Sequence, residues 1–289
     1  MSKADDSTGK CASLANTLNG VNIVSIALNL PGPAAVMRLS SFGAFITKIE
    51  PPDGDPLQAY SPAYYSELHE GIKVRRIDLK NSTDYASFSR LLDETDLLIT
   101  AQRPDALARF KLDWNSAHAR WPSLSIAAIL GHAVPHQNKP GHDLTYIAEA
   151  GLIIPPHLPP TLMADLLGAE RAVSTSLALL HDGAKNRVGR FAEVHLEEAA
   201  YVLSGPLRHG LTARNGIVGG GDPGYQLYQT QDGWIALAAL EDHFLHRVVQ
   251  GLDLDEATID KFRAAFRKHS TAHWLAWAGD RDIPLAAVG

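Results

Sequence analysis

The sequence predicts an α/β fold in which helices cover both faces of a mainly parallel sheet. Three observations support this. Short apolar runs recur along the first part of the chain, these runs are rich in β-branched residues, and the stretches between them are long enough to hold helices. The runs occupy residues 22–28, 44–49, 74–79, 97–100 and 124–130. Such alternation indicates βαβ units, and the nearly uninterrupted apolar run at 125–130 is typical of a strand buried on both faces. We therefore expect a doubly wound sheet in the first part of the chain.

The next elements extend this domain to about residue 210. Leucine, alanine and valine recur near helical spacing over residues 164–180, which predicts a long, largely buried helix. A strand at 191–195 and a helix through about Leu207 follow. Residues 20–210 are thus expected to form one large α/β domain around a Rossmann-like sheet.

A glycine-rich segment separates this domain from the rest. The stretch 216–224 breaks all periodicity, so we expect a linker or hinge at 211–224. Beyond it, residues 225–230 and 234–240 flank Asp232-Gly233, which is a strong hairpin signal. We expect a second, smaller α+β domain at 225–289 and, because residues 1–19 begin polar and acidic, a flexible N-terminal tail.

Composition narrows the class of protein. With 45% hydrophobic and 20% charged residues, the chain is expected to be a globular, cytoplasmic protein without a membrane span. The net charge of −6 argues against nucleic acid as a partner. Cys11 is the single cysteine, which rules out an intrachain disulfide and a cysteine-based metal site.

Two residues stand out for proton transfer. Asp165 begins the long apolar helix, where the simplest interpretation is an N-cap, although a helix start also offers donors to a developing oxyanion. His142, in Gly141-His142-Asp143, is one of 13 histidines and is by itself most simply a surface or packing residue. Histidine nevertheless exchanges protons near neutral pH, and Asp143 can cap the next helix.

Other site types find little support. His132, His136 and His142 lie among prolines and glycines rather than on one helical face, so we expect no metal site. The run Gly219–Gly221 lacks the Lys-Ser/Thr of a phosphate-binding loop, and the chain has no Gly-x-Ser-x-Gly motif.

A series of short motifs carries a family resemblance. In chain order they are Pro31-Gly32-Pro33, Thr47-Lys48-Ile49-Glu50, Ile77-Asp78-Leu79, Arg103-Pro104, Trp121-Pro122, Gly141-His142-Asp143, Gly189-Arg190 and Tyr228-Gln229-Thr230. Together they resemble the class III CoA-transferases and α-methylacyl-CoA racemases, the CaiB/BaiF-like family, from about Gly20 to the C-terminus.

The resemblance implies residue roles. It makes Asp165 catalytic and His142 the second proton carrier of racemase-type members, whereas many transferases have an aromatic residue there. In racemase-type members, the glutamate at the position of Glu241 pairs with that histidine. Without the resemblance, the simplest interpretation of Glu241 is a solvated carboxylate at the start of a helix. The CoA-binding positions implied in the same way are Arg38, Leu79, Arg103, Asp143 and Tyr146.

The favoured prediction is epimerisation of a 2-methylacyl-CoA by two-base 1,1-proton transfer, with coenzyme A as part of the substrate and no prosthetic group. The alternative is CoA transfer between carboxylic acids, in which Asp165 forms a mixed anhydride and then an aspartyl-CoA thioester.

The length of the chain suggests a third prediction. Family members run on past the segment that resembles 282–288 and return to the first domain, which completes an interlocked homodimer. The small domain therefore looks truncated relative to the family, so a homodimer is expected while its interlocked form is in doubt. A CoA-binding homologue without turnover stays open.

Overall fold

The computed structural model describes residues 13–289, which form two compact units, residues 13–203 and 204–289. The two units meet between Leu203 and Ser204, ahead of the glycine-rich segment in which the sequence placed the linker. Cys11 and most of the expected tail lie outside the described residues. The remainder of that tail forms turns, and the Leu18 N–H donates to the Phe42 carbonyl at 2.8 Å. Among residues 13–289, no helix is both long and apolar enough to cross a bilayer.

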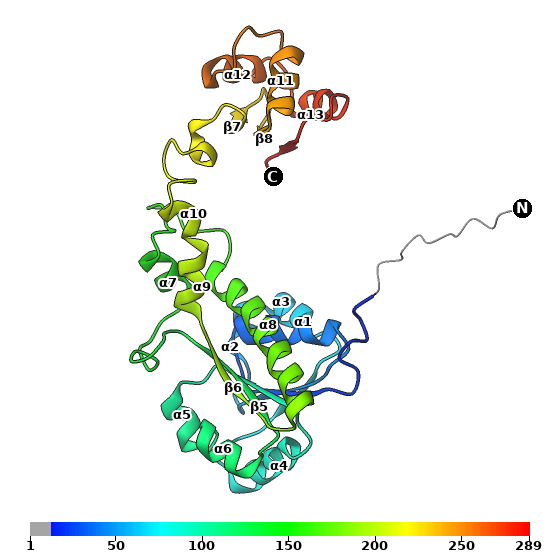
Figure 1. Ribbon diagram of the computed structural model, residues 1–289, viewed down its shortest axis with the longest axis vertical. Coiled ribbons are helices and arrows are strands. Elements are labelled where there is room, and N and C mark those ends of the chain that lie inside the picture. Colours follow the sequence, from blue (N-terminus) through cyan, green and yellow to red (C-terminus); the bar gives the residue numbers. More distant parts are fainter. Residues whose placement is uncertain (1–12) are drawn as a thin grey trace, which may run out of the picture. The chain divides into compact units, whose positions relative to one another are not determined.

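A six-stranded parallel sheet forms the centre of the first unit (Figure 1). Its strand order is β3-β2-β1-β4-β5-β6, so the direction of winding reverses between β1 and β4. This is the order of a doubly wound dinucleotide-binding sheet, and the prediction from the apolar runs is confirmed. The strands are β1 (Asn22–Ser25), β2 (Phe45–Glu50), β3 (Lys73–Arg76), β4 (Leu97–Thr100), β5 (Ser125–Leu130) and β6 (Phe191–His195).

Helices cover both faces of this sheet. One face carries the core around Leu39, Ile129 and Ala172. The helices on this side are α1 (Pro31–Ser41), α2 (Pro56–Tyr60), α3 (Pro62–Leu68), α7 (Asp143–Glu149), α8 (Met163–Asn186) and α9 (Leu196–Leu203). The other face carries the core around Phe88 and Leu98, under α4 (Ser82–Leu92), α5 (Pro104–Arg109) and α6 (Trp114–Arg120). The central strands β4 and β5 are buried along their whole length because both of their faces are covered.

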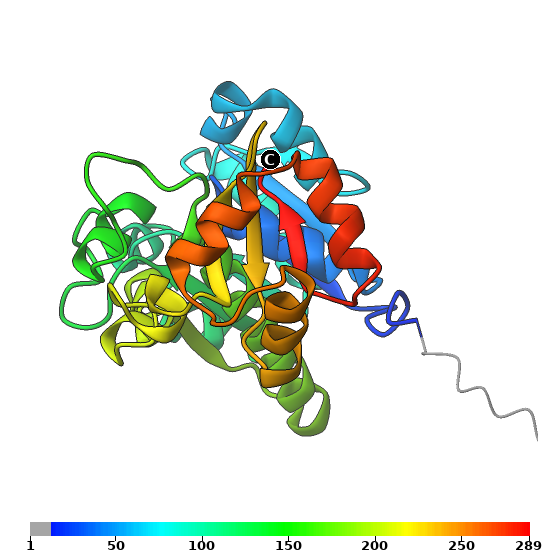
Figure 2. The same ribbon diagram turned by 90° about the horizontal axis from the view of Figure 1, so that it is seen from above.

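The second unit is a three-stranded antiparallel sheet with helices packed on one face. β7 (Tyr225–Gln229) pairs with β8 (Trp234–Ala238), which pairs with β9 (Leu285–Ala287). Figure 2 looks onto these strands, with β7 in yellow, β8 in orange and β9 in red. Their buried face forms a core with Phe262, Phe266 and Trp274. The helices are α10 (Gly205–Arg208), α11 (Asp242–Gly251), α12 (Ile259–Phe266) and α13 (Thr271–Gly279). The segment η1 (Ile217–Gly221) is a tight turn whose central residues have non-helical backbone angles.

The glycine-rich segment is tightly folded within this unit. A Cβ atom added to Gly219 would lie 1.9 Å from the Ala213 carbonyl oxygen. The Gln226 amide also donates to the Gly220 carbonyl at 3.1 Å. Glycine is needed here because the backbone packs against itself, which composition alone did not reveal.

Candidate functional site

The cavity lined by the two predicted proton-transfer residues, named the main cavity for that reason, lies at the carboxyl end of the parallel sheet. It has a volume of about 260 Å³ and is lined by residues that follow β1, β4 and β5, among them Asn29, Ala101 and Gly131. The winding of the sheet reverses between β1 and β4, and open α/β sheets bind ligands in the crevice outside the strand ends at such a point. The topology therefore places the main cavity where a ligand is expected.

His142 and Asp165 both line the main cavity. His142 is the N-cap residue of α7, and its backbone N–H donates to Thr145 Oγ1 at 3.1 Å. Asp165 lies in the first turn of α8. The two helices pack together, so residues 23 positions apart come to one cavity.

The interpretation of Asp165 as an N-cap is wrong. α8 begins at Met163 and its N-cap is Leu162, three residues before Asp165, so Asp165 lies inside the first turn of the helix. Asp143 performs capping in its place: its Oδ1 accepts a hydrogen bond of 3.0 Å from the Asp165 backbone N–H. The Asp165 carboxyl is not used in a helix cap and is left for the cavity.

The protonation of Asp165 is set by its surroundings. Burial, followed by the negative charge of Asp143, raises the pKa of Asp165 from 3.8 to about 7. Burial and the neighbouring negative charge both disfavour the carboxylate form of Asp165. At neutral pH this carboxyl therefore exists in both protonation states, which a group that both gives and takes a proton requires.

Tyr146 lines the same cavity from the next turn of α7. Its hydroxyl packs where Gly131 and Gly141 leave room: a Cβ atom at these positions would lie 2.3 Å and 2.6 Å from it. Burial, then the negative charge of Asp165, raises the pKa of Tyr146 to about 12. Tyr146 therefore stays a neutral phenol at physiological pH.

The remaining predicted binding residues fall in different places. Arg103 is the exposed N-cap residue of α5 and lines the main cavity. Leu79 lines a second cavity of about 320 Å³, formed by residues that follow β1, β2 and β3. Leu28 lines both cavities, so they are neighbours. Arg38 lines neither: it is exposed in the last turn of α1, about 10 Å along the helix from Pro31.

Glu241 lies in the second unit. It is the exposed N-cap residue of α11, as its simpler interpretation held. Its pairing with His142 stays a prediction.

The structure adds cavity residues that the sequence did not single out. Gln137 and Lys139 line the main cavity, and Lys139 supplies a second cation beside Arg103. Asn29 lines it with a left-handed backbone, φ 65°. No local pattern distinguishes these residues, because the long β5–α7 loop and the β1–α1 turn bring them to the cavity.

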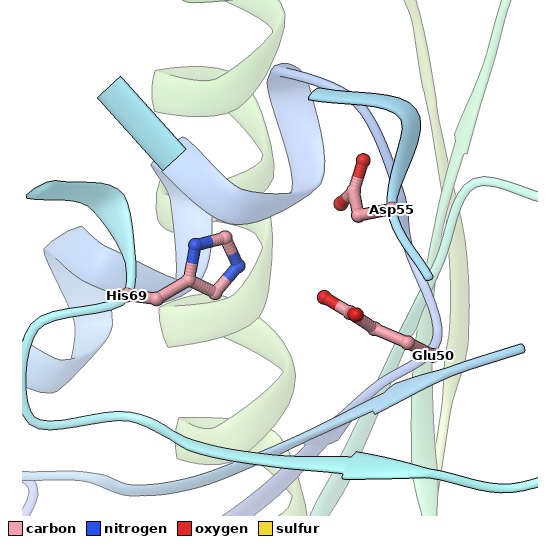
Figure 3. Close-up of side chains that lie close together, drawn as sticks. All are labelled: Glu50, Asp55 and His69. Carbon is pink, nitrogen blue, oxygen red and sulfur yellow. The ribbon is translucent and has the colours of Figure 1, made fainter. Parts of the chain in front are cut away.

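A buried charged cluster was also missed. Within residues 13–289, Glu50, Asp55 and His69 form the only group of three acidic or histidine side chains placed to share a cation (Figure 3). Lys48 Nζ already lies among them, 3.0 Å from Glu50 Oε1 and 2.5 Å from Asp55 Oδ2. The Thr47-Lys48-Ile49-Glu50 motif gave Lys48 and Glu50, but nothing local indicated that His69 would join them.

Comparison with known proteins agrees with the motifs. The family model of CoA-transferase family III matches residues 18–289. The chain belongs to this family. It is 27% identical over 260 residues to a CaiB/baiF CoA-transferase family protein of Caenorhabditis elegans, covering 82% of this chain and 73% of that one.

Relatives with named activities divide between two reactions. The human α-methylacyl-CoA racemase is 25% identical over 303 residues, covering 94% of this chain and 77% of its own. The succinyl-CoA–D-citramalate CoA-transferase of Chloroflexus aurantiacus is 26% identical over 271 residues, covering 84% and 66%. The chain thus spans about two thirds to three quarters of these relatives, and family membership does not choose between the two reactions.

Solved structures share the fold. Rv3272 from Mycobacterium tuberculosis superimposes with a TM-score of 0.83 at 21% identity, covering 95% of this chain and 83% of that one. A CAIB/BAIF family protein from Brucella suis gives 0.81 at 20% identity, covering 95% and 84%.

Proposed function

We propose that this protein binds an acyl-CoA in the first unit and epimerises a 2-methylacyl-CoA by two-base proton transfer. The observation that carries the proposal is that His142 and Asp165 line one cavity. The raised pKa of Asp165, about 7, suits a group that must act as acid in one direction and base in the other.

The reaction inverts C2 next to the thioester carbonyl. One of the two groups removes the C2 proton, and the electron pair of that bond moves onto the carbonyl oxygen to give an enolate. The other group then gives a proton to the opposite face of C2, and the electron pair returns. His142 and Asp165 exchange roles with substrate configuration.

The two cavities share Leu28 in their walls. We assign the thioester to the main cavity and the remainder of the cofactor to the path over Leu28 towards Leu79. Arg103 supplies a guanidinium whose geometry suits phosphate. Tyr146 forms part of the wall of the main cavity. Asp143 anchors the Asp165 backbone through its hydrogen bond to the Asp165 N–H. Roles for Arg38 and Glu241 stay predictions.

CoA transfer is the second candidate, favoured by relatives such as the succinyl-CoA–D-citramalate CoA-transferase. Here the Asp165 carboxylate attacks the thioester carbonyl and expels the CoA thiolate, leaving a mixed anhydride. The thiolate then attacks the aspartyl carbonyl, which releases the donor acid and forms an aspartyl-CoA thioester. The acceptor carboxylate next attacks the aspartyl carbonyl and expels the CoA thiolate, which gives a second mixed anhydride. The thiolate then attacks the acceptor's carbonyl in this anhydride, which forms the acceptor acyl-CoA and releases the Asp165 carboxylate.

Deuterium incorporation separates the two reactions. In D2O, the protein is incubated with a 2-methylacyl-CoA and no acceptor acid, and the mass at C2 is followed. We expect deuterium at C2 in the wild type and none in Asp165→Asn or His142→Ala. CoA movement between acids without exchange at C2 would establish the transferase instead. Tight CoA binding with neither reaction would establish a binding protein.

A further inference from the structure

The buried Lys48 cluster is part of neither reaction scheme. Lys48 and Glu50 are on β2, Asp55 is the N-cap residue of α2, and His69 ends α3. Lys48 is fully buried, with 0% of its side chain exposed. A charge in such a place is costly unless it is fully paired, so its partners carry information.

The Lys48 ammonium has three partners. It hydrogen-bonds with Asp55 Oδ2 at 2.5 Å and with His69 Nε2 at 2.7 Å, and it forms an ion pair with Glu50 Oε1 at 3.0 Å. His69 Nδ1 lies 2.6 Å from the Tyr65 carbonyl oxygen, which requires a proton on Nδ1 and leaves Nε2 as the acceptor. Burial also lowers the pKa of His69, which keeps the ring neutral. The three side chains of Figure 3, Glu50, Asp55 and His69, thus all contact the Lys48 ammonium.

The cluster connects to the walls of both cavities. Asp55 Oδ1 accepts hydrogen bonds from the Asn29 N–H at 3.0 Å and the Leu57 N–H at 2.9 Å. Asn29 lines the main cavity and Glu50 lines the second one. One carboxylate thus joins the buried cation to a backbone turn that faces the proposed thioester.

The turn needs such an anchor. Asn29 has a φ of 65°, a left-handed conformation that costs energy for any residue other than glycine and persists only where its surroundings hold it. On the C-terminal side of Asn29, Leu30 leads directly into two prolines in the first turn of α1. These prolines restrict the backbone only on that side of Asn29. The Asp55 carboxylate supplies the restraint on the other side.

We infer that Lys48 is a positioning residue: it is an internal cation that takes the place of a metal ion among Glu50, Asp55 and His69 and, through Asp55, fixes the Asn29 turn of the substrate cavity. The inference rests on the proposed function for its effect on catalysis. Its effect on the Asn29 turn does not depend on that function.

The first experiment measures the turn itself. Amide hydrogen exchange of the peptide that contains Asn29 is compared in wild type, Lys48→Met and Asp55→Asn, with Tyr65→Phe as the matched control. Tyr65→Phe removes a 2.8 Å hydrogen bond to Glu50 from the same cluster but does not touch Asp55. We expect at least tenfold faster exchange in the first two variants and less than twofold change in the control. Wild-type protection in folded Lys48→Met or Asp55→Asn would overturn the inference.

The second experiment tests whether a cation is what the cage requires. Lys48→Ala opens space beside two carboxylates and a neutral imidazole, which are zinc ligands. We expect Lys48→Ala to bind one Zn²⁺ per chain more than the wild type by calorimetry and to regain protection at Asn29. The double variant Lys48→Ala/His69→Ala should do neither. Slow exchange in Lys48→Ala without zinc, or zinc binding that leaves Asn29 exchanging fast, would contradict the inference.

Catalysis then links the turn to the reaction. In folded Lys48→Met, the rate of C2 deuterium incorporation should fall at least tenfold, while Leu92→Ala, a core substitution on the other face of the sheet, should lower the melting temperature without that loss. If the wild type shows no C2 exchange, the proposed function fails, and the hydrogen-exchange result still decides the role of Lys48. If Lys48→Met shows fast exchange at Asn29 but turns over at the wild-type rate, the role of Lys48 is only structural and the positioning role is refuted.

Discussion

Replacing Asp165 with asparagine should stabilise the protein while it abolishes proton transfer. The pKa of this carboxyl is about 7 in the folded chain against an ordinary 3.8. Between these values the unfolded chain holds fewer protons than the folded one, so the free energy of unfolding falls as pH rises from about 4 to about 7 and is level above that. The shift corresponds to about 4 kcal/mol at neutral pH, which is the stability that the ionised carboxyl removes.

Asparagine keeps the shape of the side chain and removes the titration. It still leaves a polar group in a partly buried place, so part of the gain is lost. A rise in Tm of roughly 5–10 °C at pH 7 to 8 follows for a domain of this size. Turnover should fall by a factor of ~10² or more, because the group that moves the proton is gone.

The assay is calorimetric unfolding of wild type and Asp165→Asn from pH 4 to pH 8. The difference between the two Tm values should be close to zero at pH 4, grow to about pH 7 and then stay level. The difference removes the contribution of every other titrating group. A difference that does not change with pH would show that the folded carboxyl has an ordinary pKa, and the reasoning about acid and base at Asp165 would fail with it.

Two further predictions address the supports of the site. Burial lowers the pKa of His69, so the unfolded chain binds the extra proton first and wild-type stability should fall as pH drops below about 6.5. The His69→Gln variant, compared by urea unfolding at pH 5 and pH 7, should lose less stability on acidification, and an equal loss would contradict this. Gly131→Ala places a Cβ 2.3 Å from the Tyr146 hydroxyl and should displace that ring. We expect about tenfold lower turnover with little change in the circular dichroism spectrum, whereas wild-type kinetics would show that the ring position is unimportant.

Local sequence was enough for the elements and their alternation. Buried parallel strands need apolar side chains on both faces, so the runs at 97–100 and 125–130 were visible without a structure. Asp232-Gly233 marked the β7–β8 hairpin for a similar reason, since a tight turn requires particular residues. The ordered motifs added the family, which the match over residues 18–289 confirms.

The ends of helices and the residues that cap them could not be predicted as well from the sequence. The apolar period of α8 is clear, but its N-cap was predicted three residues too late, at Asp165 instead of Leu162. Asp165 was therefore given a capping role that Asp143 performs. A carboxylate 22 residues earlier in the chain performs this role because α7 and α8 pack side by side. Pattern within one helix carries no information about such a partner.

The sequence by itself determined which residues form strands and helices, since burial and backbone conformation restrict residue types locally. Only the tertiary structure decided that His142 and Asp165 share a cavity and that burial raises the pKa of Asp165 to about 7. It also decided that Lys48 contacts three side chains from three elements. The physical reason is that desolvation and charge pairing depend on distance in space. The fold sets those distances between residues that the chain keeps far apart.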